Sequence, residues 1–151
     1  MEDLPDDLAM FWYLTRRIAG LLDRSGEAVF RSRIGVSLAQ FLVLSVVDAY
    51  PGRLSQQAVA DRLGLTKGTV SRQLDAAMSS GLLTVQSSPV SRRENVVALT
   101  PAGTDLVRRG DEVFREVRGT LLPTVDPADL AATLRVLGAF DDALSTRSRR
   151  H

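Results

Sequence analysis

The chain has 151 residues, 44% of them hydrophobic and 25% charged, and a formal net charge of +1, which is typical of one globular chain that can bury a sizeable core. It contains no cysteine, and its only histidine is the terminal His151. This composition excludes disulfides, thiolate metal sites, thiol-based redox switches and histidine-based catalysis, so we expect no catalytic residues, no metal and no cofactor.

The N-terminal segment and the apolar runs bear on location. The first residues, MEDLPDDL, are acidic, whereas a secretory signal carries positive charge ahead of an apolar stretch. No apolar run approaches the about 20 residues that a membrane-spanning helix needs. We therefore expect a cytoplasmic protein with no membrane partner.

The first predicted helix carries an apolar stripe, continues to about Arg33 and could kink at Gly26. A second helix follows the N-cap Ser37 and ends at the turn Tyr50-Pro51-Gly52, after which Leu54 is predicted as a very short strand or link. The stripe of the first helix has three- and four-residue steps and consists of Leu8, Phe11, Trp12, Thr15, Ile18, Ala19 and Leu22.

Two short helices flank a tight turn in the middle of the chain. Ser55 can cap a helix through about Leu63, Gly64 breaks it, and Thr66 can cap the next helix, which ends before Gly81. Such a pair is typical of a helix-turn-helix, in which a glycine permits the left-handed turn. The residues expected to fill the space between the two helices are Val59, Leu63, Leu65, Val70 and Leu74, with the small Ala60 where the helices touch.

A β hairpin and two further helices complete the predicted elements. Residues 82–86 and 95–99 are β-prone, and the polar connection between them is a candidate for a wing. Thr100-Pro101 is a strong helix start, and Asp126-Pro127 precedes the last helix. The apolar stripes of these helices contain Leu106, Val113, Val117 and Leu121, then Leu130, Leu134, Leu137 and Leu144.

Positive charge is concentrated in the middle of the chain. The segment from Gly52 to Arg93 holds six positive and two negative residues, a net charge of +4, so the remainder carries −3. A polyanion that contacts only the middle would explain this pattern, because phosphate neutralisation depends on local positive charge. Chance clustering of solvated arginines is the alternative. The charged residues of the segment are Arg53, Asp61, Arg62, Lys67, Arg72, Asp75, Arg92 and Arg93.

The second helix of the predicted pair has polar residues in its N-terminal half, the part that enters the major groove in helix-turn-helix proteins. Arginine can bond guanine edges and glutamine adenine edges in bidentate fashion, so Arg72 and Gln73 are candidates for base reading or phosphate contact. Thr66, Thr69 and Ser71 suit phosphate or mixed contacts. The alternative is a surface helix with ordinary polar side chains. The full candidate set is Thr66, Lys67, Gly68, Thr69, Ser71, Arg72 and Gln73.

Arg92 and Arg93 are expected at the tip of the hairpin, where a narrow minor groove would attract an inserted guanidinium. Paired arginines on a loop are commonly only solvated. Their position directly after the helix-turn-helix is what favours a DNA contact.

The chain resembles the MarR (multiple antibiotic resistance regulator) family in the order of three segments, LAQFLVLSVV, LSQQAVADRLGLTKGTVSRQLDAAMSSGLL and SPVSRRENVVALTPAG. The resemblance spans about Leu38 to Gly103, and the flanking helices also fit. It implies a mainly α fold with a small β-hairpin wing, in which residues 37–100 form the winged helix-turn-helix lobe. Residues 1–36 and 101–151 would then form a dimerisation lobe of N- and C-terminal helices.

One position departs from the family pattern. The family usually has an aspartate where this chain has Ser91, two residues before Arg93, and that acid is expected to orient the wing arginine. Serine can accept a hydrogen bond, but it cannot form the charge-assisted pair of a carboxylate. The implied wing contacts are Ser91, Arg92 and Arg93.

The resemblance also implies a homodimer with interleaved terminal helices, which would place two recognition helices about 34 Å apart on a near-palindromic operator. The apolar stripes of these helices are independently suitable for that role. The interface candidates are Leu8, Phe11, Trp12, Ile18, Leu134, Leu137 and Phe140.

Family members commonly respond to small aromatic or anionic effectors that bind between the dimerisation helices and the DNA-binding lobe. The lack of cysteine excludes the cysteine-oxidation sensing that some relatives use. The residues that could line an effector pocket here are Trp12, Tyr13, Arg16, Phe30 and Phe41.

The leading hypothesis is therefore a sequence-specific transcriptional regulator that binds double-stranded DNA as a homodimer and acts as a repressor. The alternative is a winged-helix protein-interaction module without specific DNA binding, for which Ser91 is a mild hint and from which salt dependence would distinguish the regulator. A third class is an enzyme that uses the carboxylates of Asp6-Asp7 or Asp141-Asp142. Adjacent acids on a helix diverge by about 100°, which favours solvated faces over a catalytic pair.

Overall fold

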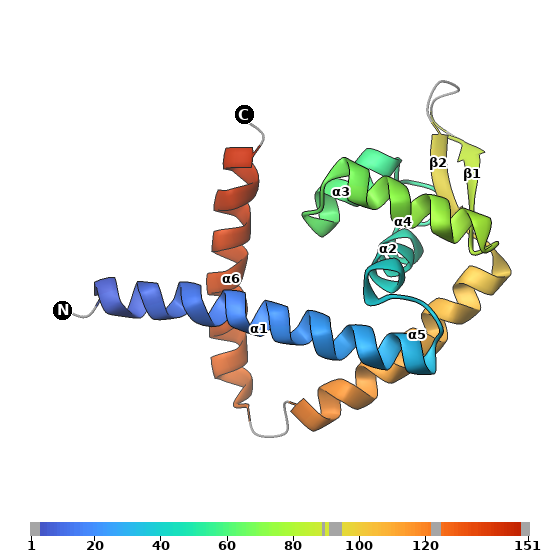
Figure 1. Ribbon diagram of the computed structural model, residues 1–151. Coiled ribbons are helices and arrows are strands. Elements are labelled where there is room, and N and C mark those ends of the chain that lie inside the picture. The colour runs from blue at the N-terminus through green and yellow to red at the C-terminus, as the bar shows by residue number, and fades with distance from the viewer. Residues whose placement is uncertain (1–3, 89, 91–94, 122–124, 149–151) are drawn as a thin grey trace. The chain divides into compact units, whose positions relative to one another are not determined.

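The computed structural model describes residues 4–88, 90, 95–121 and 125–148. These residues form six helices and one antiparallel hairpin (Figure 1), which confirms the predicted mainly α fold with a small β hairpin. The chain divides into two units, Met1–Val113 and Phe114–His151. The elements in chain order are α1 (Leu4–Arg33), α2 (Leu38–Ala49), α3 (Gln56–Leu63), α4 (Lys67–Ser79), β1 (Leu83–Ser87), β2 (Asn95–Leu99), α5 (Pro101–Leu121) and α6 (Pro127–Ser148).

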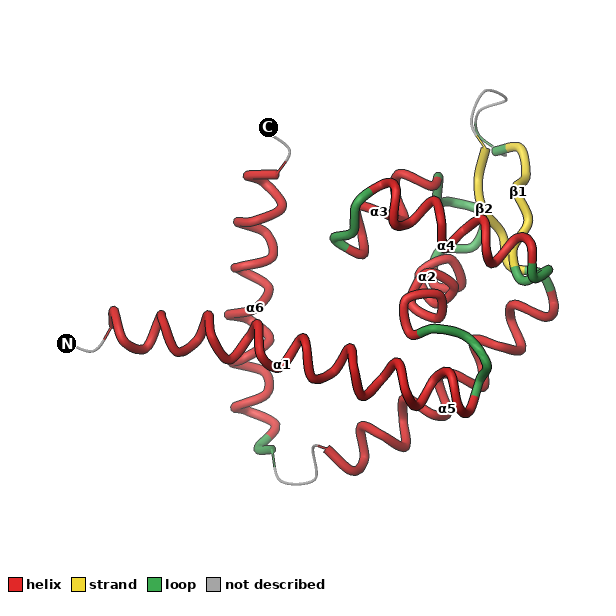
Figure 2. The backbone as a smooth tube through the Cα atoms, in the orientation of Figure 1, coloured by secondary structure: helices red, strands yellow, loops and turns green. Residues whose placement is uncertain are grey.

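Helix α2 is central to the first unit. It begins after the N-cap Ser37, whose Oγ accepts the Gln40 N–H at 3.0 Å, as the sequence predicts. Helices α1, α3 and α4 and strand β2 all contact it (Figure 2). Its buried side chains form the middle of the core, and they are Phe41, Val43, Leu44 and Val47.

Helix α1 is joined to α2 by a carboxylate and a pair of rings. Glu27 pairs with Arg31 one turn along α1, and its other oxygen accepts the Leu38 N–H at 2.9 Å in the first turn of α2. The hydrogen bond from Leu38, followed by the pairing with Arg31, holds the pKa of Glu27 below its usual value, although partial desolvation opposes the shift. The Phe30 and Phe41 rings lie 4.5 Å apart between centroids. Helix α1 runs through Gly26 without interruption.

Helices α3 and α4 form the predicted helix-turn-helix. Gly64 ends α3 with a φ of 61° and a ψ of 26°, the left-handed conformation that glycine adopts without a steric penalty. The Leu65 N–H donates to the Ala60 carbonyl at 3.2 Å and closes the turn. This bond leaves the Leu65 side chain outside both helices and 38% exposed, so the prediction that Leu65 fills the space between them was wrong. The buried contacts are made by Val59, Ala60, Val70 and Leu74.

The hairpin pairs β1 with β2 from Leu83↔Leu99 to Ser87↔Asn95, so the first strand begins one residue later than the sequence suggests. On its other edge, β2 receives the link that precedes α3, because the Val97 N–H donates to the Leu54 carbonyl at 3.0 Å. This bond fixes the loop between α2 and α3 against the hairpin.

Helix α5 starts at a close junction with the end of the helix-turn-helix. The Thr100 Oγ1 accepts the Gly103 N–H at 3.1 Å and donates to the Gly81 carbonyl at 2.6 Å. A Cβ at position 103 would clash with the Leu82 carbonyl oxygen, so only glycine permits this approach. The first half of α5 thus packs on the winged helix and buries Leu106, Val107 and Val113.

The second unit contains the end of α5 and all of α6. Asp126 begins α6, since its Oδ1 accepts the Ala128 N–H at 2.7 Å and its carbonyl accepts the Leu130 N–H at 3.0 Å. By length and composition, no single helix of the described residues could cross a membrane, and the pair that together could, Asp6–Arg33 with Leu38–Ala49, is bent by 83°.

Candidate nucleic-acid interface

The start of α4 is held by two threonines of the candidate set. The Thr66 Oγ1 accepts the Thr69 N–H at 3.2 Å, and the two hydroxyl oxygens lie 2.8 Å apart. Thr66 therefore satisfies one of the N–H groups that a helix leaves unpaired at its N-terminus. Both threonines fix the first turn of α4, a role that the sequence predicted for Thr66 but not for Thr69.

Helix α4 has one buried face and one open face. Val70, Leu74 and Ala77 are buried against the rest of the unit. Each residue turns the helix by about 100°, so Arg72 lies about 200° from Val70 and points away from the core. Arg72 is exposed, whereas its neighbour Gln73 is half-buried. The structure thus assigns the outward position to Arg72, a choice that the sequence left open.

The remaining candidates on α4 surround Arg72. Lys67 and Gly68 are exposed in the first turn, and Ser71 is half-buried. A Cβ at Gly68 would have no neighbour within 4 Å, so the backbone there is open to a close approach. Neither Lys67 nor Arg72 makes an ion pair with another residue that the structure describes. Their charges are available to an anionic partner.

The wing candidates Ser91, Arg92 and Arg93 lie outside the described residues. Of the polar connection, Ser88 and Val90 are described, and the Val90 N–H donates to the Ser88 Oγ at 3.2 Å. The Val90 side chain is 94% exposed.

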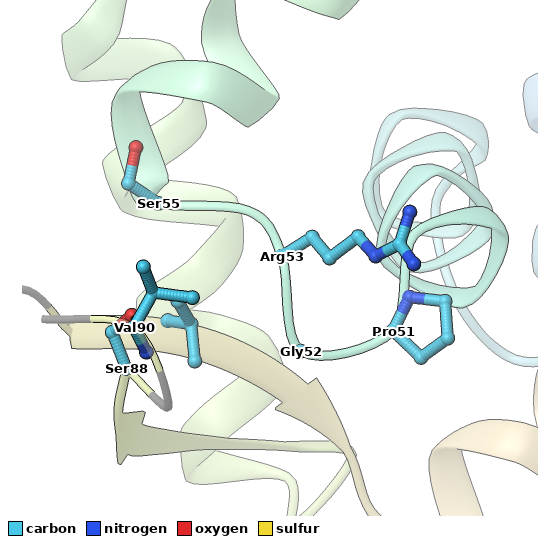
Figure 3. A pocket seen from close by; sticks show the side chains of 7 residues that line it. Pro51, Gly52, Arg53, Ser55, Ser88 and Val90 are labelled. Carbon is cyan, nitrogen blue, oxygen red and sulfur yellow. The ribbon is translucent and has the colours of Figure 1, made fainter.

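Two arginines of the basic segment have surroundings that the sequence did not reveal. The Arg62 guanidinium lies over the Tyr50 ring at 3.9 Å, a contact between α3 and the end of α2 that no local pattern predicts. Arg53 is exposed and lines a hollow between the loop of residues 51–55 and the hairpin (Figure 3). Its charge within the basic segment was the signal that could have placed it among the candidates.

Comparison with known proteins supports this interpretation. The model of the MarR family matches residues 34–94. The uncharacterized protein Rv2011c of Mycobacterium tuberculosis is 33% identical over 130 residues, which cover 86% of this chain and 89% of that protein. The chain belongs to the MarR family. It is a winged-helix DNA-binding transcriptional regulator.

Solved structures of more distant sequence have the same fold. The DNA complex of MepR from S. aureus aligns with a TM-score of 0.78 at 21% identity, over 89% of this chain and 96% of that one. CouR from Rhodococcus jostii RHA1, bound to p-coumaroyl-CoA, aligns with a TM-score of 0.80 at 18% identity, over 93% of this chain and 96% of that one.

The dimer-interface candidates of this MarR-family chain are apolar side chains on α1 and α6. Phe11 and Phe140 are half-buried within the single chain. The other candidates are exposed, with fractions of 55% for Leu8, 51% for Trp12, 51% for Ile18, 60% for Leu134 and 38% for Leu137.

The candidates for a MarR-type effector pocket fall into two groups. Phe30 and Phe41 pack on each other and are only 2% and 3% exposed. Trp12, Tyr13 and Arg16 are exposed on the first half of α1. A helical rise of about 1.5 Å per residue puts Trp12 about 27 Å from Phe30 along α1, so one chain does not bring both groups around one small molecule.

Proposed function

We propose that the protein binds double-stranded DNA as a homodimer and represses transcription from a near-palindromic operator. The observation that carries this proposal is the open face of α4, where Arg72 projects between the exposed Gly68 and the solvent with no ion pair to another described residue. In helix-turn-helix proteins this part of the second helix enters the major groove.

The residues of α4 divide between two kinds of contact in this proposal. Arg72 reads a base edge, because a guanidinium can form a bidentate pair with guanine. Lys67, Thr69 and Ser71 contact phosphates, with Thr66 holding the first turn, and Gln73 contributes from the flank of the helix. Ser91, Arg92 and Arg93 enter the neighbouring minor groove.

The proposed dimer covers apolar surface that the single chain leaves open. Leu8, Trp12 and Ile18 on α1 and Leu134 on α6 are each more than half exposed. Burying a side chain of this size contributes about 1.5–3 kcal/mol, so a few such residues on each subunit suffice for a stable dimer. Two-fold symmetry would then place two α4 helices about one turn of B-DNA apart, about 34 Å.

We further propose that a small aromatic or anionic effector releases the repressor. The exposed Trp12, Tyr13 and Arg16 offer stacking surface and a positive charge within two turns of α1. CouR, which shares the fold, is a regulator bound to p-coumaroyl-CoA. Phe30 and Phe41 would join the site only by moving apart, since they fill the space between α1 and α2 at present.

Fluorescence anisotropy with the DNA upstream of the protein's own gene and a shuffled control tests the DNA contact. We expect tight binding that prefers the upstream DNA, weakens steeply with salt and saturates at one dimer per site. Equal and weak binding to both DNAs, followed by failure to enrich any site from random DNA, would favour the alternative protein-interaction module.

Analytical ultracentrifugation of wild type and of Leu134→Glu tests the dimer. We expect the wild type to sediment as a dimer and the variant to shift towards monomer, because an unpaired carboxylate in an apolar interface is strongly unfavourable. A monomeric wild type at micromolar concentration would contradict the proposal.

A further inference from the structure

A hollow of about 430 Å³ lies between the α2–α3 loop and the hairpin (Figure 3). Its walls come from parts of the chain that are far apart in the sequence but fixed to each other, because the Val97 N–H donates to the Leu54 carbonyl at 3.0 Å. The hollow is therefore part of the winged helix and not a gap between independent segments. Its lining residues are Pro51, Gly52, Arg53, Ser55, Ser88, Val90 and Val96.

The chemistry of the hollow suits an anion. Arg53 supplies a full positive charge, Ser55 and Ser88 supply hydroxyl groups, and no carboxylate is among the lining residues. Arg53 is exposed and makes no ion pair with another residue in the described part of the chain. A guanidinium forms strong, charge-assisted hydrogen bonds with phosphate oxygens.

The hollow also borders the elements that face DNA. Arg53 precedes the first residue of α3 by one short turn, and in helix-turn-helix proteins the first helix of the pair crosses the DNA backbone. Ser88 and Val90 belong to the base of the hairpin whose tip is the candidate wing. A strand that passes from the groove of α4 to the wing would therefore run beside Arg53.

We propose that Arg53 binds a phosphate of the DNA backbone at this hollow, as a sequence-independent contact between those of α4 and the wing. This inference rests on the proposed DNA-binding function. In Figure 3 the Arg53 side chain extends along the Pro51 side of the loop, and Ser88 and Val90 lie on the hairpin side. An exposed arginine changes rotamer readily, so its guanidinium can follow the phosphate on either side.

The test compares wild type, Arg53→Ala and Arg53→Lys by anisotropy on upstream and shuffled DNA over a series of salt concentrations. We expect Arg53→Ala to weaken binding to both DNAs by the same factor, about tenfold at low salt. The slope of log K against log salt should fall in magnitude by about 0.9, the value for one phosphate contact. Arg53→Lys should keep the slope, since it keeps the charge.

Arg147→Ala is the matched control, because it removes one positive charge from the second unit, far along the chain from the helix-turn-helix. It should leave the slope unchanged. Circular dichroism confirms that each variant is folded. An unchanged slope for Arg53→Ala, or a loss confined to the upstream DNA, would overturn the phosphate contact alone. Failure of the wild type to bind either DNA would overturn the proposed function and the contact together.

Discussion

Gly110 on α5 lies so close to the ring of Phe41 on α2 that a Cβ at this position would clash with it. Phe41 is held on its other side by Phe30 of α1, at 4.5 Å between ring centroids. One aromatic side chain of the DNA-binding lobe therefore contacts both helices that lead out of that lobe.

Gly110→Ala should destabilise the protein by about 1–3 kcal/mol, because the added methyl group forces the buried Phe41 ring out of place. The matched control is Gly119→Ala in the same helix, where a Cβ meets nothing within 4 Å. It should stabilise α5 by up to about 1 kcal/mol, as alanine favours a helix over glycine. Urea unfolding measures both, and a Gly110→Ala variant as stable as wild type would contradict the packing described.

Glu27→Gln should lower stability at neutral pH and make no difference at low pH. The pKa of Glu27 is lowered in the folded chain, first by the hydrogen bond from the Leu38 N–H and then by Arg31. The stabilisation is therefore present above the unfolded pKa of about 4.3 and is lost as the pH falls through the folded value. Solvent screening limits the effect, because the Glu27 side chain is 38% exposed.

Urea unfolding of wild type and Glu27→Gln at several pH values between 3 and 7 checks this prediction. Glu112→Gln, which removes one partner of the exposed pair with Arg108 on α5, is the control. A difference between wild type and Glu27→Gln that stays constant across the series would show that ionisation of Glu27 is not the cause.

Thr66→Ala should destabilise the protein by about 1 kcal/mol, because it removes the hydroxyl that accepts the Thr69 N–H at the start of α4. Thr66→Ser keeps the acceptor and should retain most of the stability. Thermal unfolding of the two variants separates the cap from the lost methyl group. If Ser and Ala were equally destabilising, the hydroxyl would not be the group that matters.

Arg72→Ala should weaken binding to operator DNA and reduce the preference over shuffled DNA by about 1–3 kcal/mol, the range for one bidentate base contact. Arg72→Lys keeps the charge but not the planar pair of donors, so it should bind both DNAs with little preference. Anisotropy measures the ratio of the two affinities. Retention of the wild-type ratio by either variant would remove Arg72 from base reading.

Much of the fold is predictable because local chemistry specifies it. Ser37, Ser55 and Thr66 each begin a helix through a side-chain hydrogen bond to the backbone three residues later, and Gly64 ends α3 in the left-handed conformation. These signals act over a few residues, so they can be recognised in the sequence. The structure confirms all four.

Contacts between distant residues were not predictable in the same way. The sequence could not show that Phe30 and Phe41 pack on each other, or that Arg53 and Ser88 border one hollow, because these residues come from different elements. Nor could it choose between Arg72 and Gln73, since the choice depends on which side of α4 the core covers. Tertiary packing decides such questions.

The junction at Thr100 has a consequence for how regulators of this kind diversify. Hydrogen bonds from Thr100 to the Gly81 carbonyl and from Gly103 to Thr100 hold the end of the α4 turn through the backbone. The inward side chains of α4 hold the rest of the helix. The outward positions, Gly68 and Arg72 among them, are therefore under no packing constraint, and duplicated genes can acquire new target sites by changing them while inheriting the same scaffold.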